Sequence, residues 1–130
     1  MKVMALDYGR ARTGVAVSDP TGAVARPLGV VENVNDQDGL EKLLHVIRIE
    51  EPERIVVGLP LTLRGERGEQ VRETELFVEA LRDIVEIPVE VYDERFTTNL
   101  AEGGGAAEED ARAAAYLLSS YLEWASRPQQ

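Results

Sequence analysis

Cysteine is absent from the sequence, so neither a disulfide framework nor a thiolate metal site can form. Histidine occurs once, at His45, beside the apolar stripe of an expected helix, and we assign it no functional role. No run of about 18 apolar residues is present, and the apolar run at residues 1–6 is too short for a signal peptide. We therefore expect a cytoplasmic protein without a membrane-spanning segment.

Basic residues are scarce: 14 Lys and Arg stand against 24 Asp and Glu, which gives a net charge of −10 at pH 7. This balance argues against a non-specific nucleic-acid binder, which usually presents a basic face. However, 12 of the 14 basic residues are Arg, the residue suited to bidentate phosphate contacts, and several fall in expected loops. Those loop arginines are Arg10, Arg12, Arg26, Arg64, Arg67 and Arg95.

The rest of the composition is that of an ordinary globular protein, with 130 residues, of which 44% are hydrophobic and 29% charged. We expect one α/β domain spanning residues 1–130, with a frayed tail at 127–130. Apolar runs and stripes predict the order βββαβαβα, in which an antiparallel meander is followed by parallel crossovers. The expected strands are residues 3–6, 15–17, 23–31, 54–58 and 89–93. The first expected helix starts after residues 35–36, and the other two cover residues 69–85 and about 107–124.

Asp7 stands where the first expected strand gives way to a turn region bounded by Gly9 and Gly14. A carboxylate at the end of a buried strand is costly unless it is hydrogen-bonded or binds a cation. Asp7 therefore either caps the turn by accepting backbone N–H bonds, or ligates a metal ion or orients a phosphate. This stretch alone leaves both interpretations open.

Two further acidic points occur at comparable places in the chain. Asp93 and Glu94 stand at the end of the fifth expected strand, and open α/β sheets place their ligands at strand carboxyl ends. Asp110 lies three and four residues before Ala113 and Ala114, which puts it on the core-facing stripe of the last helix. Each has a plainer interpretation, because loop carboxylates are often solvated and acidic residues in a first turn favour the helix dipole.

Convergence of these carboxylates would raise the pKa of at least one of them unless cations bind between them. Without Cys or a usable His, the expected ions are Mg²⁺ or Mn²⁺, held by Asp7, Asp93, Glu94 and Asp110. Two such ions about 4 Å apart stabilise the attacking and leaving oxygens of a phosphodiester displacement, so no protein nucleophile is needed. Flanking side chains would hold the phosphates; the candidates are Arg10, Arg12, Arg64, Arg67, Arg95, Thr97 and Thr98.

Four blocks of the sequence resemble the YqgF/RuvX family. They are residues 5–9 with 12–19, residues 55–61, residues 93–98, and residues 110–118 with 121–122. That family is described as Holliday junction resolvases, is also implicated in maturing the 5′ end of pre-16S ribosomal RNA, and has a ribonuclease-H-like fold. The resemblance implies a five-stranded mixed sheet, with the first three strands antiparallel and the last two parallel to the first. It also implies a catalytic, metal-binding set of Asp7, Glu94 or Asp93, and Asp110.

One segment departs from the family pattern, and it keeps other functions open. Residues 102–110 are short, glycine-rich and acidic, whereas the family's connection here is longer and rich in Lys and Arg. Loss of those cations weakens phosphate binding, which predicts a weak nuclease, or a non-catalytic ribosome-assembly or adaptor module of the same fold. Residues 7–17 also resemble the phosphate loop of the actin, sugar-kinase and Hsp70 superfamily, but those proteins need a second domain for which 130 residues leave no room.

The sequence does not separate a four-way DNA junction from precursor ribosomal RNA as the substrate. A junction would favour a homodimer, because two strands must be cut alike. Trp124 and Phe96 are the apolar candidates for such a contact. Ribosome-assembly factors are the other protein partners considered.

Overall fold

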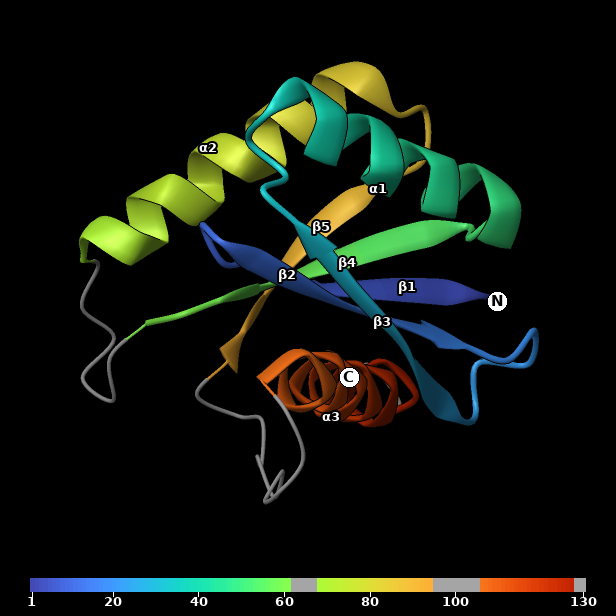
Figure 1. Ribbon diagram of the computed structural model, residues 1–130. Coiled ribbons are helices and arrows are strands. Elements are labelled where there is room, and N and C mark those ends of the chain that lie inside the picture. The colour runs from blue at the N-terminus through green and yellow to red at the C-terminus, as the bar shows by residue number, and fades with distance from the viewer. Residues whose placement is uncertain (62–67, 95–105, 128–130) are drawn as a thin grey trace.

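The computed structural model describes residues 1–61, 68–94 and 106–127, and it contains five strands and three helices (Figure 1). The strands form one sheet in the order β3-β2-β1-β4-β5. The elements are β1 (Val3–Asp7), β2 (Arg12–Ser18), β3 (Ala25–Glu32), α1 (Gln37–Glu50), β4 (Arg54–Leu59), α2 (Glu69–Ile84), β5 (Val89–Asp93) and α3 (Ala106–Ala125).

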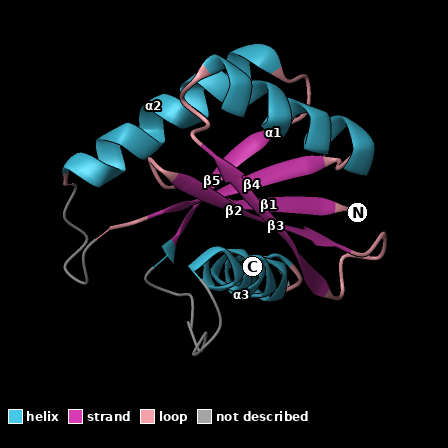
Figure 2. Cartoon of the chain, in the orientation of Figure 1, coloured by secondary structure: helices cyan, strands magenta, loops and turns pink. Residues whose placement is uncertain are grey.

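The strand directions confirm the mixed sheet expected from the sequence. β1 pairs antiparallel with β2, and β2 pairs antiparallel with β3, while β4 runs parallel to β1 and β5 runs parallel to β4. Helices α1 and α2 cover one face of the sheet and α3 covers the other (Figure 2). The carboxyl ends of β1, β4 and β5 therefore meet at one edge of a three-layer α/β fold.

The two faces of β1 supply the two halves of the core. Met4 and Leu6 pack on the side of α1 and α2, whereas Val3 and Ala5 pack against α3. All four side chains are buried, as expected for a central strand covered on both faces, whose sequence is a continuous apolar run. This alternation fixes the face on which each following residue lies, and Asp7 shares the α3 face with Val3 and Ala5.

The third strand begins two residues later than the sequence predicted, at Ala25, and extends to Glu32. It is an edge strand, as its Pro27 predicts, because proline has no N–H to donate to a second neighbouring strand. Pro27 pairs with Ala16 beside an irregularity in the register of β2 and β3. Exposed Val24 lies just before the strand rather than within it.

The two helices on the first face follow their predicted apolar stripes with one error. Asp36 occupies the N-cap of α1, although its side chain makes no capping hydrogen bond. The apolar spacing of residues 69–85 predicts an inner side of five residues, of which four are buried; the fifth, Ile84, is the last residue of the helix and is 46% exposed. Those four residues are Val71, Phe77, Val78 and Leu81.

Helix α3 packs on β1, β2 and β3 through Ala114, Leu117, Leu118 and Tyr121, which are all buried. The small side chain of Ala114, which is fully buried, allows the helix to lie close to the sheet. Trp124, proposed as an apolar contact residue, is exposed, and Phe96 lies outside the described residues. Within the described part of the chain, every helix is too short or too polar to cross a membrane.

Candidate active site

Strand alternation brings Asp7 and Glu94 to the same face of the sheet. Asp7 is the last residue of β1, and Glu94 directly follows β5. On β5, Val89 packs toward α1 and α2 while Tyr92 packs toward α3, so Glu94 follows Tyr92 onto the α3 face. By the same alternation, Asp93 is directed to the opposite face. Of the two adjacent carboxylates that the sequence left open, the fold brings Glu94 to Asp7.

Asp7 and Glu94 are hydrogen-bonded through their side chains. Burial, the hydrogen bond to Asp7 and the negative charges of Asp7 and Asp93 together raise the pKa of Glu94 to about 8, and burial is the largest of these causes. Burial also raises the pKa of Asp7, while the bond from Glu94 opposes this and the charge of Asp110 adds to it. Glu94 therefore carries the shared proton and donates it to the Asp7 carboxylate.

Gly58 on β4 provides the space that Glu94 occupies. A Cβ atom at Gly58 would collide with Oε1, Cγ and Cδ of Glu94. The side chain of Glu94 thus lies directly across the backbone of β4 as it reaches toward β1. A glycine inside a strand often marks such a close approach.

Asp110 reaches the same edge of the sheet from the first turns of α3. A Cβ atom at Gly14 would collide with the backbone carbonyl of Asp110, so α3 begins in backbone contact with β2. Gly14 is also paired with Asp7 across the β1–β2 ladder, which places Asp110 beside Asp7. The carboxylate of Asp110 accepts a hydrogen bond of 2.7 Å from Nε of Arg12, and these two side chains form an ion pair.

As these carboxylates lie in the structure, no three acidic or histidine side chains among the described residues form a ready metal-binding group. Two of the three are held by a shared proton and the third by Arg12. The donor set nevertheless fits a hard divalent cation, because it offers only carboxylate oxygens. The proton shared by Asp7 and Glu94 and the guanidinium of Arg12 neutralise carboxylates that a bound cation would neutralise instead. Asp7, Glu94 and Asp110 are the residues that would hold it.

The remaining predicted residues divide into those near this edge and those outside the described residues. Arg10 lies in the β1–β2 turn and forms an ion pair with Glu73 of α2. Asp93 lies beside Glu94 at the end of β5. The other predicted nucleic-acid contacts fall outside the described residues, as does most of the acidic connection at 102–105; these are Arg64, Arg67, Arg95, Thr97 and Thr98.

Sequence reasoning missed the partners that hold the site together. The prediction took Arg12 as a phosphate ligand, but in the structure it neutralises Asp110, which is 98 residues away. In the sequence, Gly14 only bounds a turn region and Gly58 only ends an expected strand. Their place inside strands was the available signal, because a glycine in a strand interior otherwise weakens it.

We expect Glu94→Gln to stabilise the metal-free protein at alkaline pH. Glu94 keeps its proton in the folded state up to a pKa of about 8, whereas the unfolded chain releases it near 4.5. The folded state binds more protons between these values, so the stability of the wild type falls as the pH rises from 4.5 through 8. Glutamine cannot lose a proton, so this part of the pH dependence is removed.

Urea unfolding in EDTA at pH 5, 7 and 9 measures this effect, with Glu79→Gln on the exposed side of α2 as the control. The free energy of unfolding of Glu94→Gln should exceed that of the wild type by an amount that grows from pH 5 to pH 9. A constant difference across that range would contradict the shared proton.

Comparison with known proteins gives a consistent assignment. Residues 1–124 match the RuvX family, described as Holliday junction resolvase. A protein of Sulfurihydrogenibium sp. is 40% identical, covering 94% of this chain and 90% of that protein. A protein of Roseiflexus sp. is 45% identical, covering 78% of this chain and 72% of that protein. Both carry the name "Putative pre-16S rRNA nuclease".

Solved structures agree on the fold. T. thermophilus RuvC in complex with a Holliday junction substrate superposes with a TM-score of 0.59 at 19% identity, covering 97% of both chains. Fowlpox virus resolvase, solved with substrate Holliday junction DNA, superposes with a TM-score of 0.56 at 12% identity, covering 98% of this chain and all of that one. These likenesses support the ribonuclease-H-like α/β fold. With the match of residues 1–124 and relatives at 40% identity or more, the chain belongs to the RuvX family.

Proposed function

We propose that the chain is a divalent-metal-dependent endonuclease that hydrolyses phosphodiester bonds in structured nucleic acid. The observation that carries this proposal is the pair of half-buried, hydrogen-bonded carboxyl groups of Asp7 and Glu94, with Asp110 at the same sheet edge. Buried carboxylates with shifted pKa values in one place are typical of a functional site. The family match and the nuclease name of the relatives support the same reaction.

Asp7, Glu94 and Asp110 are the proposed ligands of Mg²⁺ or Mn²⁺, with Glu94 preferred to Asp93. A pair of such ions supplies activated water and stabilises the charge on the attacking and leaving oxygens. The residues of this chain would hold the metal ions at one edge of the sheet and position the phosphate. Arg12, which lies beside Asp110 and is 45% exposed, is placed to contact a phosphate once it leaves that carboxylate.

Two substrates follow from the comparisons. The name of the relatives favours precursor 16S ribosomal RNA, while the family description and the two resolvase complexes favour a four-way DNA junction. The test is metal-dependent cleavage of both substrates in parallel, in Mg²⁺, in Mn²⁺ and in EDTA. Faster cleavage of one assigns the substrate, and no cleavage of either would contradict the proposed function. Sedimentation with and without the junction tests the proposed homodimer, in which exposed Trp124 is the candidate contact.

A non-catalytic adaptor of the same fold is the second candidate. It is favoured by the pairing of the arginines at this edge with acidic partners, Arg10 with Glu73 and Arg12 with Asp110, in a chain of net charge −10. Such pairing leaves little positive potential for phosphates. Binding to assembling ribosomal particles without cleavage of either nucleic acid is the result that this candidate predicts.

Replacing Arg12 by glutamine should strengthen metal binding while weakening cleavage. An exposed ion pair is worth about 0.2–1 kcal/mol, so freeing Asp110 should tighten the Mn²⁺ dissociation constant by about 1.4- to fivefold. Calorimetric titration with Mn²⁺ measures the first effect and the cleavage assay the second. Arg127→Gln, which removes the distant ion pair with Glu123, is the matched control. Unchanged Mn²⁺ affinity in Arg12→Gln would contradict the competition between Arg12 and the metal ion for Asp110.

A further inference from the structure

A hollow of about 590 Å³ opens on the α1–α2 side of the same sheet edge. We name it the Tyr8 hollow, after the residue that directly follows Asp7. Its floor is aromatic, because the rings of Tyr8 and Phe77 stack with their centroids 4.7 Å apart and both are buried. Its lining includes Tyr8, Asn35, Glu73, Leu76, Phe77 and Ala80.

Polar groups converge on this apolar floor. The carboxamide of Asn35 donates a hydrogen bond of 2.7 Å to the hydroxyl of Tyr8, and it also has an acceptor oxygen and a second N–H. The ion pair of Arg10 and Glu73 lies at the rim. Leu76 lines the hollow with a side chain that is 67% exposed. Apolar walls with a few convergent polar groups are typical of small-molecule and cofactor sites.

The position of the hollow links it to the candidate active site. Asp7 and Tyr8 are consecutive, so their side chains lie on opposite faces at the end of one strand. The turn that follows carries Arg10, which reaches α2, and leads to Arg12, which reaches α3. A nucleic-acid strand that crosses this turn passes from Asp7 to the Tyr8 hollow and meets an arginine on each side.

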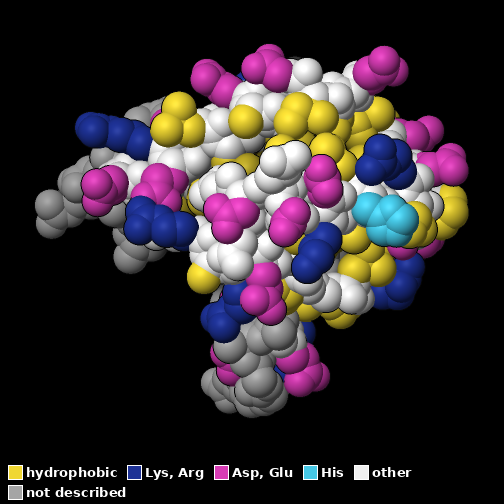
Figure 3. All heavy atoms as spheres, turned by 45° about the horizontal axis from the view of Figure 1, so that its top comes forward, with side chains coloured by type: hydrophobic (Ala, Val, Ile, Leu, Met, Phe, Trp, Pro, Cys, Tyr) yellow, Lys and Arg dark blue, Asp and Glu magenta, His cyan; other side chains and the backbone are white. Residues whose placement is uncertain are grey.

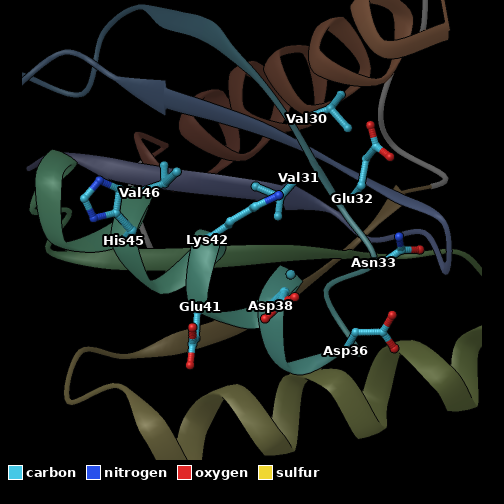
Figure 4. Close-up of a pocket in the computed structure, with 11 residues that line it drawn as sticks. Val30, Val31, Glu32, Asn33, Asp36, Asp38, Glu41, Lys42, His45 and Val46 are labelled. Atoms are coloured by element: carbon cyan, nitrogen blue, oxygen red, sulfur yellow. The ribbon is translucent and has the colours of Figure 1, made fainter.

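A smaller hollow of about 290 Å³ shares Tyr8, Arg10 and Glu73 with it, whereas two larger hollows among the described residues lack its aromatic floor. The hollow between β3 and α1, of about 910 Å³, is lined by four carboxylates, and Lys42 extends from α1 toward β3 within it (Figure 4). Its acidic residues, Glu32, Asp36, Asp38 and Glu41, would repel a phosphate chain. The other larger hollow, of about 720 Å³, lies near Pro52 and Ile84, at the amino ends of β4 and β5. Hydrophobic side chains also gather over the α1–α2 face in Figure 3, but the Tyr8 hollow borders the proposed catalytic edge.

We propose that the Tyr8 hollow binds the base of one unpaired nucleotide next to the scissile phosphate, while Arg10 exchanges Glu73 for that nucleotide's phosphate. This inference rests on the proposed function and names the part of the substrate that the site recognises. Stacking on aromatic rings is how proteins hold unpaired bases, and it requires single-stranded or bulged nucleic acid at that point. The carboxylate of Glu73 and the carboxamide of Asn35 supply polar groups for the base edge.

Ala80→Phe tests the hollow without removing any contact of the fold. Ala80 lines the hollow from an exposed position on α2, so a phenylalanine there fills the space that a base would take. Ala125→Phe, at an exposed position near the end of α3, is the matched control. The probe is a single-stranded RNA oligonucleotide with 2-aminopurine at each position in turn, bound in EDTA so that no cleavage is needed.

We expect the wild type and Ala125→Phe to quench 2-aminopurine at one position and Ala80→Phe to bind about tenfold more weakly without that quenching. Equal binding and quenching by all three proteins would overturn the proposed base binding in the Tyr8 hollow, whether or not the wild type cleaves. If the wild type showed position-specific quenching but no metal-dependent cleavage, the proposed reaction alone would be overturned. If the wild type did not bind the oligonucleotide at all, the proposed base binding would be overturned. The cleavage assay tests the reaction separately.

Discussion

Replacing Asp7 by asparagine should reduce metal-dependent cleavage by at least about a hundredfold while the protein stays folded. The side chain lies at the end of a central strand and is hydrogen-bonded to Glu94. Because its position is fixed in this way, we expect that a neighbouring carboxylate cannot take over its role as a metal ligand. Asparagine has the same shape and can keep a hydrogen bond to Glu94, but it supplies no negative charge for a cation. Because burial raises the pKa of Asp7, removing its charge should not lower the stability of the metal-free protein.

The measurement is the initial rate of cleavage in Mn²⁺, together with thermal melting in EDTA and in Mn²⁺. Asp110→Asn should give the same loss of rate, and both variants should lose the rise in melting temperature that Mn²⁺ gives the wild type. Asp83→Asn, on the exposed end of α2, controls for the loss of one acidic residue. Full activity in both Asp7→Asn and Asp110→Asn would refute the metal assignment.

The fold could be predicted because its signals are local. The apolar run of β1, the stripes of α2 and α3 and the proline of β3 each determine their own element, and the structure confirms them apart from Ile84 and a few element ends. Ile84 fails because it is the last residue of α2, and its exposed side chain lines an open hollow with Leu44 and Ile47 of α1. A periodic pattern in the sequence does not show at which residue a helix stops packing against the core.

The site was predicted less completely because its contacts join distant parts of the chain. The pattern of residues 89–94 alternates, but it could not assign Glu94 to a face until α3 was known to cover Tyr92. Arg12 looked like a free phosphate ligand because nothing near it in sequence is its partner. The hydrogen bond between Asp7 and Glu94 likewise depends on the parallel pairing of β4 with both β1 and β5.

Gly14→Ala should destabilise the protein by about 3 kcal/mol and abolish metal binding at Asp110. Gly14 lies in the ladder opposite Asp7, and a Cβ atom there would collide with the carbonyl carbon and oxygen of Asp110. Both colliding groups are backbone, so no side-chain rotation can relieve the contact. The start of α3 has to move away from β2, and it carries the carboxylate of Asp110 with it.

Gly68→Ala is the control, because a Cβ atom at Gly68 meets nothing within 4 Å. Its cost should stay within about 1 kcal/mol, as expected for a change at the N-cap of α2. Urea unfolding measures the stability of both variants, and Mn²⁺ titration shows whether the metal site survives. If Gly14→Ala were as stable as the wild type and bound Mn²⁺ with the same affinity, α3 would not begin in contact with β2. Asp110 would then lack the backbone support that places it beside Asp7, and the three-carboxylate site would lose its structural basis.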